Sequence, residues 1–200
     1  MSQRHVADEL DTTRGQALED DRLLDAARAS VLAVGVRRTT VTDVARRAGV
    51  SRMTLYRRFP DIEALLAALM TREFGRLIAD STAEVSGGSA RERMVATVVH
   101  SARTLAQDPL FERLIDVDPE LLLPYVTQRL GGMQRMAVAV GAEVLAAGDG
   151  SVRTDVPPAV LSAGIELLTR GFVLAARGEL EPELDPWAEL ARAVDGYLRP

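Results

Sequence analysis

The sequence predicts an all-α protein with a small helical head and a larger helical bundle. Ala, Leu and Arg, which favour helices, are abundant, and runs of β-branched residues are few. In one segment after another, apolar residues recur every three or four positions. Proline, glycine and capping residues separate these segments, and 200 residues that are 47% hydrophobic can form a sizeable core.

Composition excludes several classes of function. The chain has no cysteine, so disulfides and thiolate metal sites are excluded, and its two histidines, His5 and His100, fit no metal-binding motif. No glycine-rich phosphate loop is present, and Asp116 and Asp118 are interpreted as a polar helix end rather than a metal site. No run approaches 18 consecutive apolar residues, and the acidic N-terminus does not resemble a signal peptide. We therefore expect a cytoplasmic protein with no metal, cofactor, enzymatic activity or membrane association.

The first 35 residues divide into an arm and a first helix. Residues 1–19 are polar without sustained periodicity, which predicts a flexible arm. From Asp20 or Asp21, either of which can cap a helix, apolar residues recur at helical spacing as far as Gly35. This helix would supply an apolar wall for the segment that follows.

The segment from Thr40 to Phe59 predicts two short helices joined by a tight turn. Thr40 can cap the first helix, with Asp43 closing a capping box, and Gly49 can end it. Ser51 can cap the second, whose apolar seam is Leu55 and Phe59. Its other face carries arginines, hydroxyls and a tyrosine, which suit a helix that enters a DNA major groove. The pattern is that of a helix-turn-helix.

Charge separates this interpretation from the alternative, a helical hairpin whose arginines merely face solvent. From Arg28 to Pro60 there are eight arginines and one acidic residue, a local balance of +7. The whole chain is −5, so the remainder sums to −12. A basic region in an acidic protein is typical of a DNA-binding surface.

The rest of the chain predicts a helical domain. Pro60-Asp61 stops the preceding helix and caps the next one. This next helix, of about five turns, crosses from a DNA-binding domain, residues 20–66, into a domain of residues 67–200. Ser86 to Ser89 is a linker. Helices are then expected at about 90–107, in a short segment after Asp108-Pro109, after Asp118-Pro119 with a break at Pro124, from Leu130 to Val144, and at about 158–177 and 185–198.

The run from Arg22 to Leu66 resembles the N-terminal domain of the tetracycline-repressor (TetR) family of bacterial transcription regulators. The spacing is kept at Gly35, Thr40, Val44-Ala45, Ala48-Gly49-Val50-Ser51, Thr54-Leu55-Tyr56 and Phe59. The resemblance implies about nine helices, a three-helix DNA-binding head, and a C-terminal domain that dimerises and usually encloses a small-molecule pocket. It also favours a repressor.

Carried over residue by residue, the resemblance implies which side chains meet DNA. Those near phosphates would be Thr40, Ser51, Thr54, Tyr56 and Arg58, and those nearest base edges would be Arg52, Met53 and Arg57. Three positions depart from the usual pattern. Ile62 stands where a lysine is common, Met53 where a small residue is usual, and Pro157 where a helix cap is expected.

The C-terminal domain offers apolar residues from several helices that would converge on a ligand pocket. Methionine fills irregular space and tolerates varied ligands. Each residue could instead be ordinary core, and His100 could orient a ligand or lie at the edge. Glu166 and Arg170, four apart, are interpreted as an intrahelical pair. The predicted ligand-binding residues are Phe74, Val98, Val99, His100, Phe111, Leu114, Met133, Met136, Val140 and Leu167.

The last two helices carry narrow seams with small residues, which predict helix pairing across a homodimer. The alternative is that both seams face the protomer's own core. A single half-site contact needs doubling to be specific, which favours the dimer. The predicted interface is Gly164, Leu168, Gly171, Phe172, Ala175, Trp187, Leu190, Ala191 and Val194.

These observations predict a transcriptional regulator that binds a palindromic operator as a homodimer. A small, largely apolar effector, uncharged or weakly acidic, would release it by favouring a state with the wrong spacing of recognition helices. Two alternatives remain open. One is a DNA-binding regulator with no small-molecule ligand, controlled by a protein partner or constitutive. The other is an enzyme with an ancillary DNA-binding head, for which the sequence offers no catalytic residues.

Overall fold

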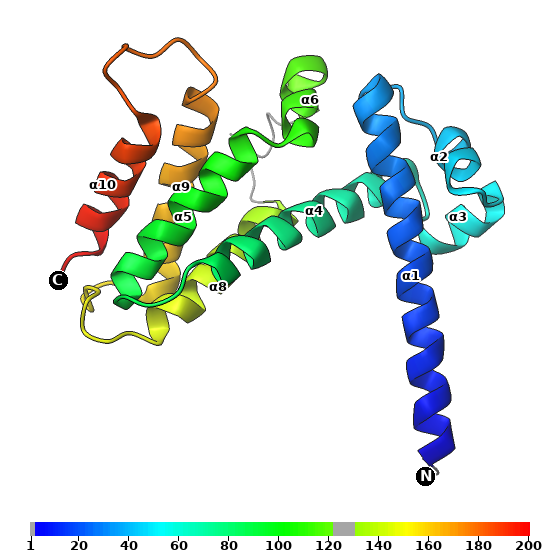
Figure 1. The fold of residues 1–200 in the computed structure, drawn as a ribbon. Coiled ribbons are helices and arrows are strands. Elements are labelled where there is room, and N and C mark those ends of the chain that lie inside the picture. Colours follow the sequence, from blue (N-terminus) through cyan, green and yellow to red (C-terminus); the bar gives the residue numbers. More distant parts are fainter. Residues whose placement is uncertain (1–2, 122–130) are drawn as a thin grey trace.

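The computed structural model describes the backbone of residues 3–121 and 131–200, where all regular structure is helical (Figure 1). The fold class is thus confirmed, with nine α-helices in these two ranges. Pro124 and Leu130, where a break and a helix start were predicted, lie outside them. The helices are α1 Gln3–Val34, α2 Val41–Ala48, α3 Arg52–Arg58, α4 Ile62–Glu84, α5 Ala90–Ala106, α6 Pro109–Val117, α8 Gly132–Ala146, α9 Pro158–Ala175 and α10 Pro186–Leu198, with the short 3₁₀ helix η1 Pro119–Leu121 after α6.

The head consists of α1, α2, α3 and the first part of α4. Its core is a continuous set of leucines, valines and alanines, most of them fully buried. Two leucines of α6, Leu110 and Leu114, belong to the same core. The head core extends along α4 to Leu69, beyond the boundary at Leu66 drawn from the sequence.

The first helix is longer than predicted. It begins at Gln3, so residues 3–19, expected to be a flexible arm, are helical, and this part projects beyond the head (Figure 1). Adding a residue to an existing helix is far easier than nucleating one, so a helix can continue through a segment without apolar periodicity. Asp20 and Asp21 are therefore not caps. They lie inside the helix, and their carboxylates pair with Arg58 and Arg72, respectively.

The body is formed by α5, α8, α9 and α10, with α9 packed on the other three. The predicted ranges of these helices agree with the structure within two residues at nearly every end, and Ser86 to Ser89 joins α4 to α5 as predicted. Ser89 caps α5 in a full capping box with Glu92. At α9 the side-chain cap is indeed missing at Pro157, and the helix begins with Pro158.

Two helices belong to both cores. In α4, Leu65 and Leu69 lie in the head core, whereas Phe74, one turn further, packs on the body core. In α6, Leu110 and Leu114 lie in the head core, and Phe111 lies in the body core. Residues one apart on a helix point about 100° apart, so a single short helix can serve two cores.

A tight joint fixes the end of α1 against the end of α6. The Val36 backbone N–H donates to Asp118 Oδ2 at 2.7 Å, and Asp118 is 1% exposed. Gly35 has φ +84°, and a Cβ there would lie 2.8 Å from Val117 Cγ1. Asp118 is therefore a buried tie between head and body, more specific than the polar helix end that the sequence predicts.

Candidate DNA-binding surface and ligand cavity

The helix-turn-helix forms through the predicted caps. Thr40 Oγ1 accepts a hydrogen bond from the Asp43 backbone N–H at 3.2 Å, and Ser51 Oγ accepts one from Thr54 at 3.0 Å. Asp43 completes its box by accepting from the Thr40 hydroxyl at 2.6 Å rather than from its backbone. Gly49 is left-handed at φ +71°, which ends α2 and turns the chain into α3.

The outer face of α3 brings four of the predicted DNA contacts together. Leu55 is fully buried in the head core, whereas Met53 is 77% exposed and Tyr56 48% exposed. Arg52 and Arg57 are exposed on the same side. This surface, Arg52, Met53, Tyr56 and Arg57, is available to a DNA groove without rearrangement of the head.

The hydroxyl residues sit at the rim of this surface with their groups partly engaged. The Thr40 hydroxyl already donates to Asp43, and the Ser51 and Thr54 hydroxyls lie 2.9 Å apart and bond to each other. A phosphate oxygen would have to compete for these hydrogens or accept from backbone N–H groups at the helix starts. Their predicted role at phosphates thus comes second to capping.

Arg58 lies apart from the exposed group. Its Nε is 2.7 Å from Asp20 Oδ1, and its Nη2 donates to the Gln16 carbonyl oxygen at 2.7 Å. The side chain is 19% exposed. In the DNA-free chain Arg58 therefore ties α3 to α1, and its placement at a phosphate stays a prediction.

The basic region is less charged than the sequence count implies. Four of its eight arginines, Arg28, Arg37, Arg46 and Arg58, form ion pairs with acidic residues. Three of these arginines pair with acidic residues outside the segment from Arg28 to Pro60, so the charge sum over that segment does not include those acids. Those left without an acidic partner among the described residues are Arg38, Arg47, Arg52 and Arg57.

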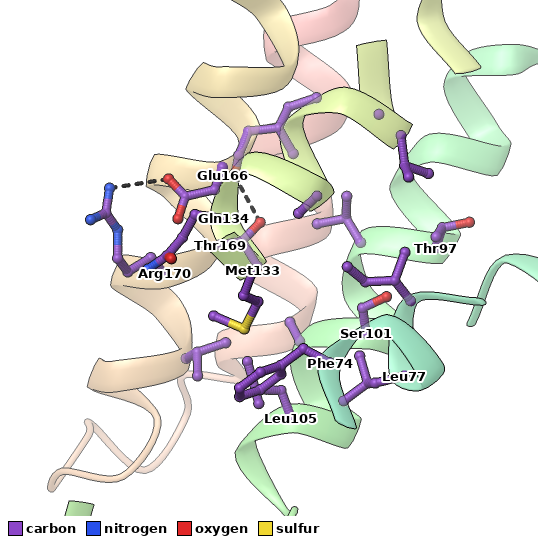
Figure 2. A pocket seen from close by; sticks show the side chains of 18 of the residues that line it. Phe74, Leu77, Thr97, Ser101, Leu105, Met133, Gln134, Glu166, Thr169 and Arg170 are labelled. Carbon is purple, nitrogen blue, oxygen red and sulfur yellow. Dashed lines mark hydrogen bonds and ion pairs between the residues drawn. The ribbon is translucent and has the colours of Figure 1, made fainter. Parts of the chain in front are cut away.

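A cavity of about 210 Å³ lies inside the body between α4, α5, α6, α8 and α9. Its wall is mostly apolar, and five of the ten predicted ligand-binding residues line it (Figure 2). These five are Phe74, Val98, Phe111, Met133 and Val140.

The other five predicted residues lie elsewhere, so these predictions are corrected. Val99 and His100 line an open groove between α5 and α10, and the His100 ring pairs with Glu84 at 3.3 Å. Leu114 lies in the head core, Met136 packs against α4 at Gly75, and Leu167 is 61% exposed. Apolar periodicity did not distinguish residues that face the cavity from residues that face away from it, because these helices carry apolar residues on both faces.

Polar groups of the cavity were mostly missed. Thr97, Ser101, Gln134 and Thr169 line it, and so do Glu166 and Arg170, which form the predicted intrahelical pair at 3.1 Å. Burial raises the pKa of the Glu166 carboxyl above its ordinary value, although the Arg170 guanidinium opposes this shift. A polar residue on an otherwise apolar helix face was the available signal.

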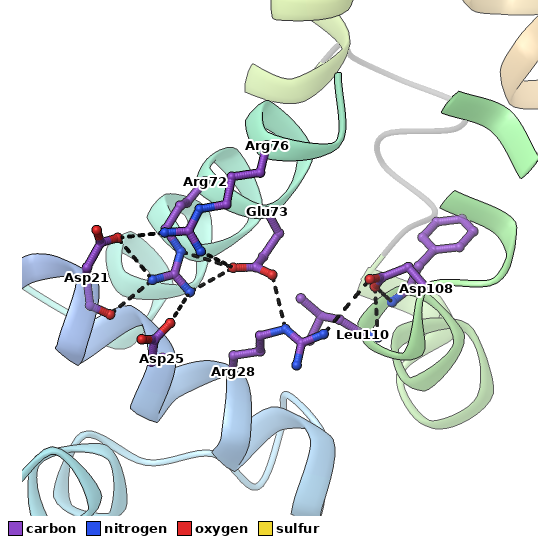
Figure 3. A network of polar contacts seen from close by, with 9 residues as sticks. Asp21, Asp25, Arg28, Arg72, Glu73, Arg76, Asp108 and Leu110 are labelled. Carbon is purple, nitrogen blue, oxygen red and sulfur yellow. Dashed lines mark hydrogen bonds and ion pairs between the residues drawn. The ribbon is translucent and has the colours of Figure 1, made fainter. Parts of the chain in front are cut away.

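An ionic network joins the head to the shared helices (Figure 3). Arg72 of α4, only 10% exposed, contacts Asp21 and Asp25 of α1 and its neighbour Glu73. Burial opposes the charge of Arg72, yet hydrogen bonds to Glu73 and Asp21 raise its pKa. Arg28 of α1 reaches Glu73 at 3.0 Å and Asp108, the cap of α6, at 4.0 Å. The network thus fixes α1, α4 and α6 relative to one another.

The predicted dimer seam divides between core and surface. Leu190 and Val194 are fully buried in the protomer's own core, and a Cβ on Gly164 would lie 2.6 Å from the Tyr197 hydroxyl of the same chain. Leu168, Phe172 and Trp187 pack on the same core, and Ala191 lines the groove beside α5. Apart from Ala191, these residues face the protomer's own core, as the alternative of an internal seam expects, and α9 and α10 pack on each other.

A second face of α9 points outward. Val160 is 54% exposed, Leu167 is 61% exposed, and nothing lies within 4 Å of a Cβ on Gly171. Gly171 and Ala175 are exposed members of the predicted interface. In the described part of the chain, α9 is also the one helix that by length and composition could span a membrane, with 28% of it buried.

Among the residues whose side chains the structure describes, no group of three or more His, Asp or Glu could hold a metal. Asp116 instead pairs with Arg177 at 2.8 Å, and Asp118 bonds the backbone of Val36.

Comparison with known proteins identifies relatives that cover most of the chain. The family model described as bacterial regulatory proteins, tetR family, matches residues 23–69. An uncharacterised HTH-type transcriptional regulator of Mycobacterium tuberculosis is 37% identical over 183 residues, covering 88% of this chain and 93% of that protein. A counterpart from Mycobacterium bovis is 34% identical over 182 residues with the same coverage.

Solved structures share the fold. The repressor QsdR of R. erythropolis superposes with a TM-score of 0.68 at 21% identity, covering 92% of this chain and 97% of that one. The repressor AlkX of Dietzia sp., implicated in biodegradation of n-alkanes, gives a TM-score of 0.60 at 23% identity, covering 88% and 90%. These similarities confirm that the protein is a DNA-binding transcriptional regulator and not an enzyme. The chain belongs to the TetR family of bacterial transcriptional regulators.

Proposed function

We propose that this regulator is a repressor that binds a palindromic operator as a homodimer and leaves it when a small, largely apolar molecule fills the cavity. Arg52, Met53 and Arg57 would face base edges, and Tyr56 with the capping hydroxyls of Thr40, Ser51 and Thr54 would contact phosphates. Arg58 would reach a phosphate only on leaving Asp20.

The observation that supports ligand control is that α4 and α6 each contribute residues to both the head core and the body core. Phe74 and Phe111 line the cavity, while Leu69 and Leu110 of the same two helices lie in the head core. A molecule that displaces either phenylalanine therefore acts on a helix that the head is built on. The packed head core passes on such a movement, because close-packed interiors have few voids to absorb it.

The energy required is modest. In a dimer competent to bind, the two α3 helices would lie about 34 Å apart, one turn of DNA. A ligand that binds a state with different spacing about 100-fold more tightly supplies roughly 2.7 kcal/mol of coupling, within the usual range for allosteric regulators.

The cavity also bears on the alternative of a regulator without a small-molecule ligand. That alternative predicts a filled C-terminal core, whereas about 210 Å³ is open between α4 and α9. An apolar void of this kind weakens the fold unless something occupies it, since its walls lose packing contacts. This favours an effector.

We infer that the outward face of α9 is covered by a second protomer in the cytoplasm and does not contact a membrane. Glu166 and Arg170 lie in the middle of α9. Ionisable residues at the centre of a membrane span are costly. Pairing of the Val160, Leu167 and Gly171 face with its symmetry mate buries apolar side chains and keeps the charged pair inside the protomer.

Selection of duplexes from a random DNA library tests the operator proposal. The expected product is a palindrome whose half-site centres are about one helical turn apart, bound by two protomers. Fluorescence anisotropy should show a half-site duplex binding about 100-fold or more weakly than the full palindrome. Equal affinity of one protomer for half-site and full site would contradict the dimer, and a selected site without symmetry would contradict the palindrome.

A reporter assay tests repression. A promoter overlapping the selected palindrome is placed before a reporter gene in a heterologous bacterial host, with and without the regulator. Reporter output should fall when the regulator is present and should be unaffected when the palindrome is scrambled. An increase at the intact palindrome would identify an activator.

A further inference from the structure

Several polar side chains of the cavity have already used their hydrogens. The Thr169 hydroxyl donates to the Ile165 carbonyl at 2.7 Å, Thr82 donates to Ile78 at 2.8 Å, and Ser162 donates to Val138 at 2.8 Å. A hydroxyl has one hydrogen, so these three can accept a hydrogen bond from a ligand but cannot donate one.

A different set is open to a ligand. Thr97 and Ser101, one turn apart on α5, have hydroxyls without a hydrogen-bond partner among the described residues. On the α9 wall, Glu166 Oε2 accepts from Arg170, while Oε1 has no partner within the described ranges. The cavity therefore offers a carboxylate acceptor on one wall and hydroxyl groups on another.

Among the described residues that line the cavity, positive and negative charges are equal in number. Glu166 and Arg170 are the two charged residues among the described ones that line it, and they are 11% and 17% exposed. An anionic ligand would add a negative charge beside Glu166, where water is scarce. A cationic ligand would likewise add a positive charge beside Arg170. The same burial raises the pKa of the Glu166 carboxyl, although the Arg170 guanidinium opposes this shift.

Apart from Gln134, whose amide oxygen accepts from the Gly131 backbone N–H at 2.8 Å, the remaining described lining is hydrocarbon. Figure 2 shows Phe74, Leu77 and Leu105 gathered at one end, away from Glu166 and Thr97. A molecule that fills the cavity would therefore place an apolar part against these side chains and a polar group towards α9.

We propose that the cavity binds an uncharged lipophilic molecule with one polar end group, a hydroxyl or an amide, that donates a hydrogen bond to Glu166. Glu166 is then the residue that determines specificity, because it accepts from a neutral donor and repels a carboxylate. This inference rests on the proposed function, since it names the ligand class of the same cavity, and it narrows that ligand from uncharged or weakly acidic to uncharged.

Three probes of one chain length test the proposal on the full-length protein. Isothermal titration at pH 8 compares 1-decanol, decanoate and decylammonium. Decanol should bind, and each ion should bind about tenfold or more weakly, because each brings an unbalanced charge to the pair. Tighter binding of either ion, equal binding of all three, or no binding of decanol would overturn the inference.

A variant that removes the negative charge of Glu166 gives a sharper test. Glu166→Gln keeps the shape of the side chain but leaves the Arg170 charge without its acidic partner on α9. Decanoate should then gain about tenfold or more and overtake decanol. The matched control is Glu189→Gln, in the more exposed pair with Arg192 at 3.0 Å, which should keep the preference for decanol. An unchanged preference in a folded Glu166→Gln protein would overturn the role of Glu166, and the three wild-type titrations test the ligand class independently.

Operator binding separates this inference from the proposed function. If decanol binds but leaves the protein–operator complex intact, the ligand class stands and release by a ligand falls. If decanoate binds more tightly and releases the operator, the proposed function stands and the uncharged ligand is wrong.

Discussion

Single side chains on α3 differ in how freely they can reach DNA. Arg52 and Arg57 are exposed and have no acidic partner among the described residues, whereas Arg58, one position further, is held by Asp20 and Gln16 of α1. The same residue type thus serves two tasks within two turns of helix. Sequence spacing shows that these arginines face away from Leu55, but a partner more than 35 positions away along the chain is invisible to it.

Arg52 should be a base-reading residue. Arg52→Ala is expected to weaken binding to the selected operator by about 1–3 kcal/mol and to relax base preference at one position in each half-site. The measurement is anisotropy on the operator and on its single-base variants.

Arg47→Ala is the matched control, because Arg47 is exposed on α2 and likewise has no acidic partner in the described part of the chain. It should weaken all sequences alike and lower the salt dependence of binding. If operator and random duplex lose the same affinity in Arg52→Ala, Arg52 contacts only the backbone.

At the scale of the elements, the ends of α1 and α6 form the joint between the two cores. Asp118 accepts from the backbone of Val36, and Gly35 brings the chain within contact of Val117. The ionic network of Arg28, Arg72 and Glu73 braces the same helices further along. Helix α6 can thus respond to the cavity only by moving a joint that has almost no free space.

A comparison of Gly35→Ala with Gly49→Ala separates the effect of backbone conformation on the free energy of unfolding from the effect of packing. Both glycines have positive φ, +84° and +71°, but a Cβ at Gly35 meets Val117 whereas one at Gly49 meets nothing within 4 Å. Gly49→Ala should lower the free energy of unfolding by about 1 kcal/mol, the conformational cost alone. Gly35→Ala should lose about 2–4 kcal/mol, since overpacking adds to it.

Urea unfolding at one fixed protomer concentration measures both changes. Equal losses in the two variants would mean that the α6 end yields to the added methyl group without strain.

Much of the element level could be predicted from sequence, because its signals are local. Caps at Thr40, Ser51 and Asp61, and the left-handed turn at Gly49, depend on neighbours three or four residues away, and the structure confirms them. The continuation of α1 to Gln3 could not be predicted from apolar spacing. Five of the ten predicted ligand-binding residues line the cavity and five do not, since periodicity finds an apolar face but not the element that covers it.

At the scale of the whole molecule, the outward face of α9 is the surface proposed to join two protomers. Val160 and Leu167 are more than half exposed in the single chain, and a large apolar surface on a soluble protein commonly marks an interface. Two residues of the predicted seam, Gly164 and Leu168, pack against the protomer's own α10 and core. Small residues allow close helix approach but do not show from which chain the approaching helix comes.

Gly171→Glu should convert the protein to monomers. Nothing within the protomer lies within 4 Å of the new Cβ, so the fold should persist while a buried, unpaired charge blocks the symmetric contact. Sedimentation equilibrium measures the change, and circular dichroism confirms the fold.

Thr104→Glu, an exposed position on α5, is the control and should leave the dimer intact. A Gly171→Glu protein that remains dimeric would place the interface on another face, and operator affinity of the monomer should fall with the lost half-site contact.

The membership of Leu110 and Leu114 in the head core also sets a rule for building chimeric regulators. A graft that cuts within α4 and transfers only the first 66 or so residues would leave behind two leucines that seal the transplanted core. The recipient would have to supply an α6 of matching shape, together with an acid at position 118 to hold the donor's Val36. The portable unit is therefore discontinuous in sequence: Leu110, Leu114 and Asp118 belong with the head, whereas Phe111 lines the cavity and has to stay with the recipient's body if the response to its effector is to be kept.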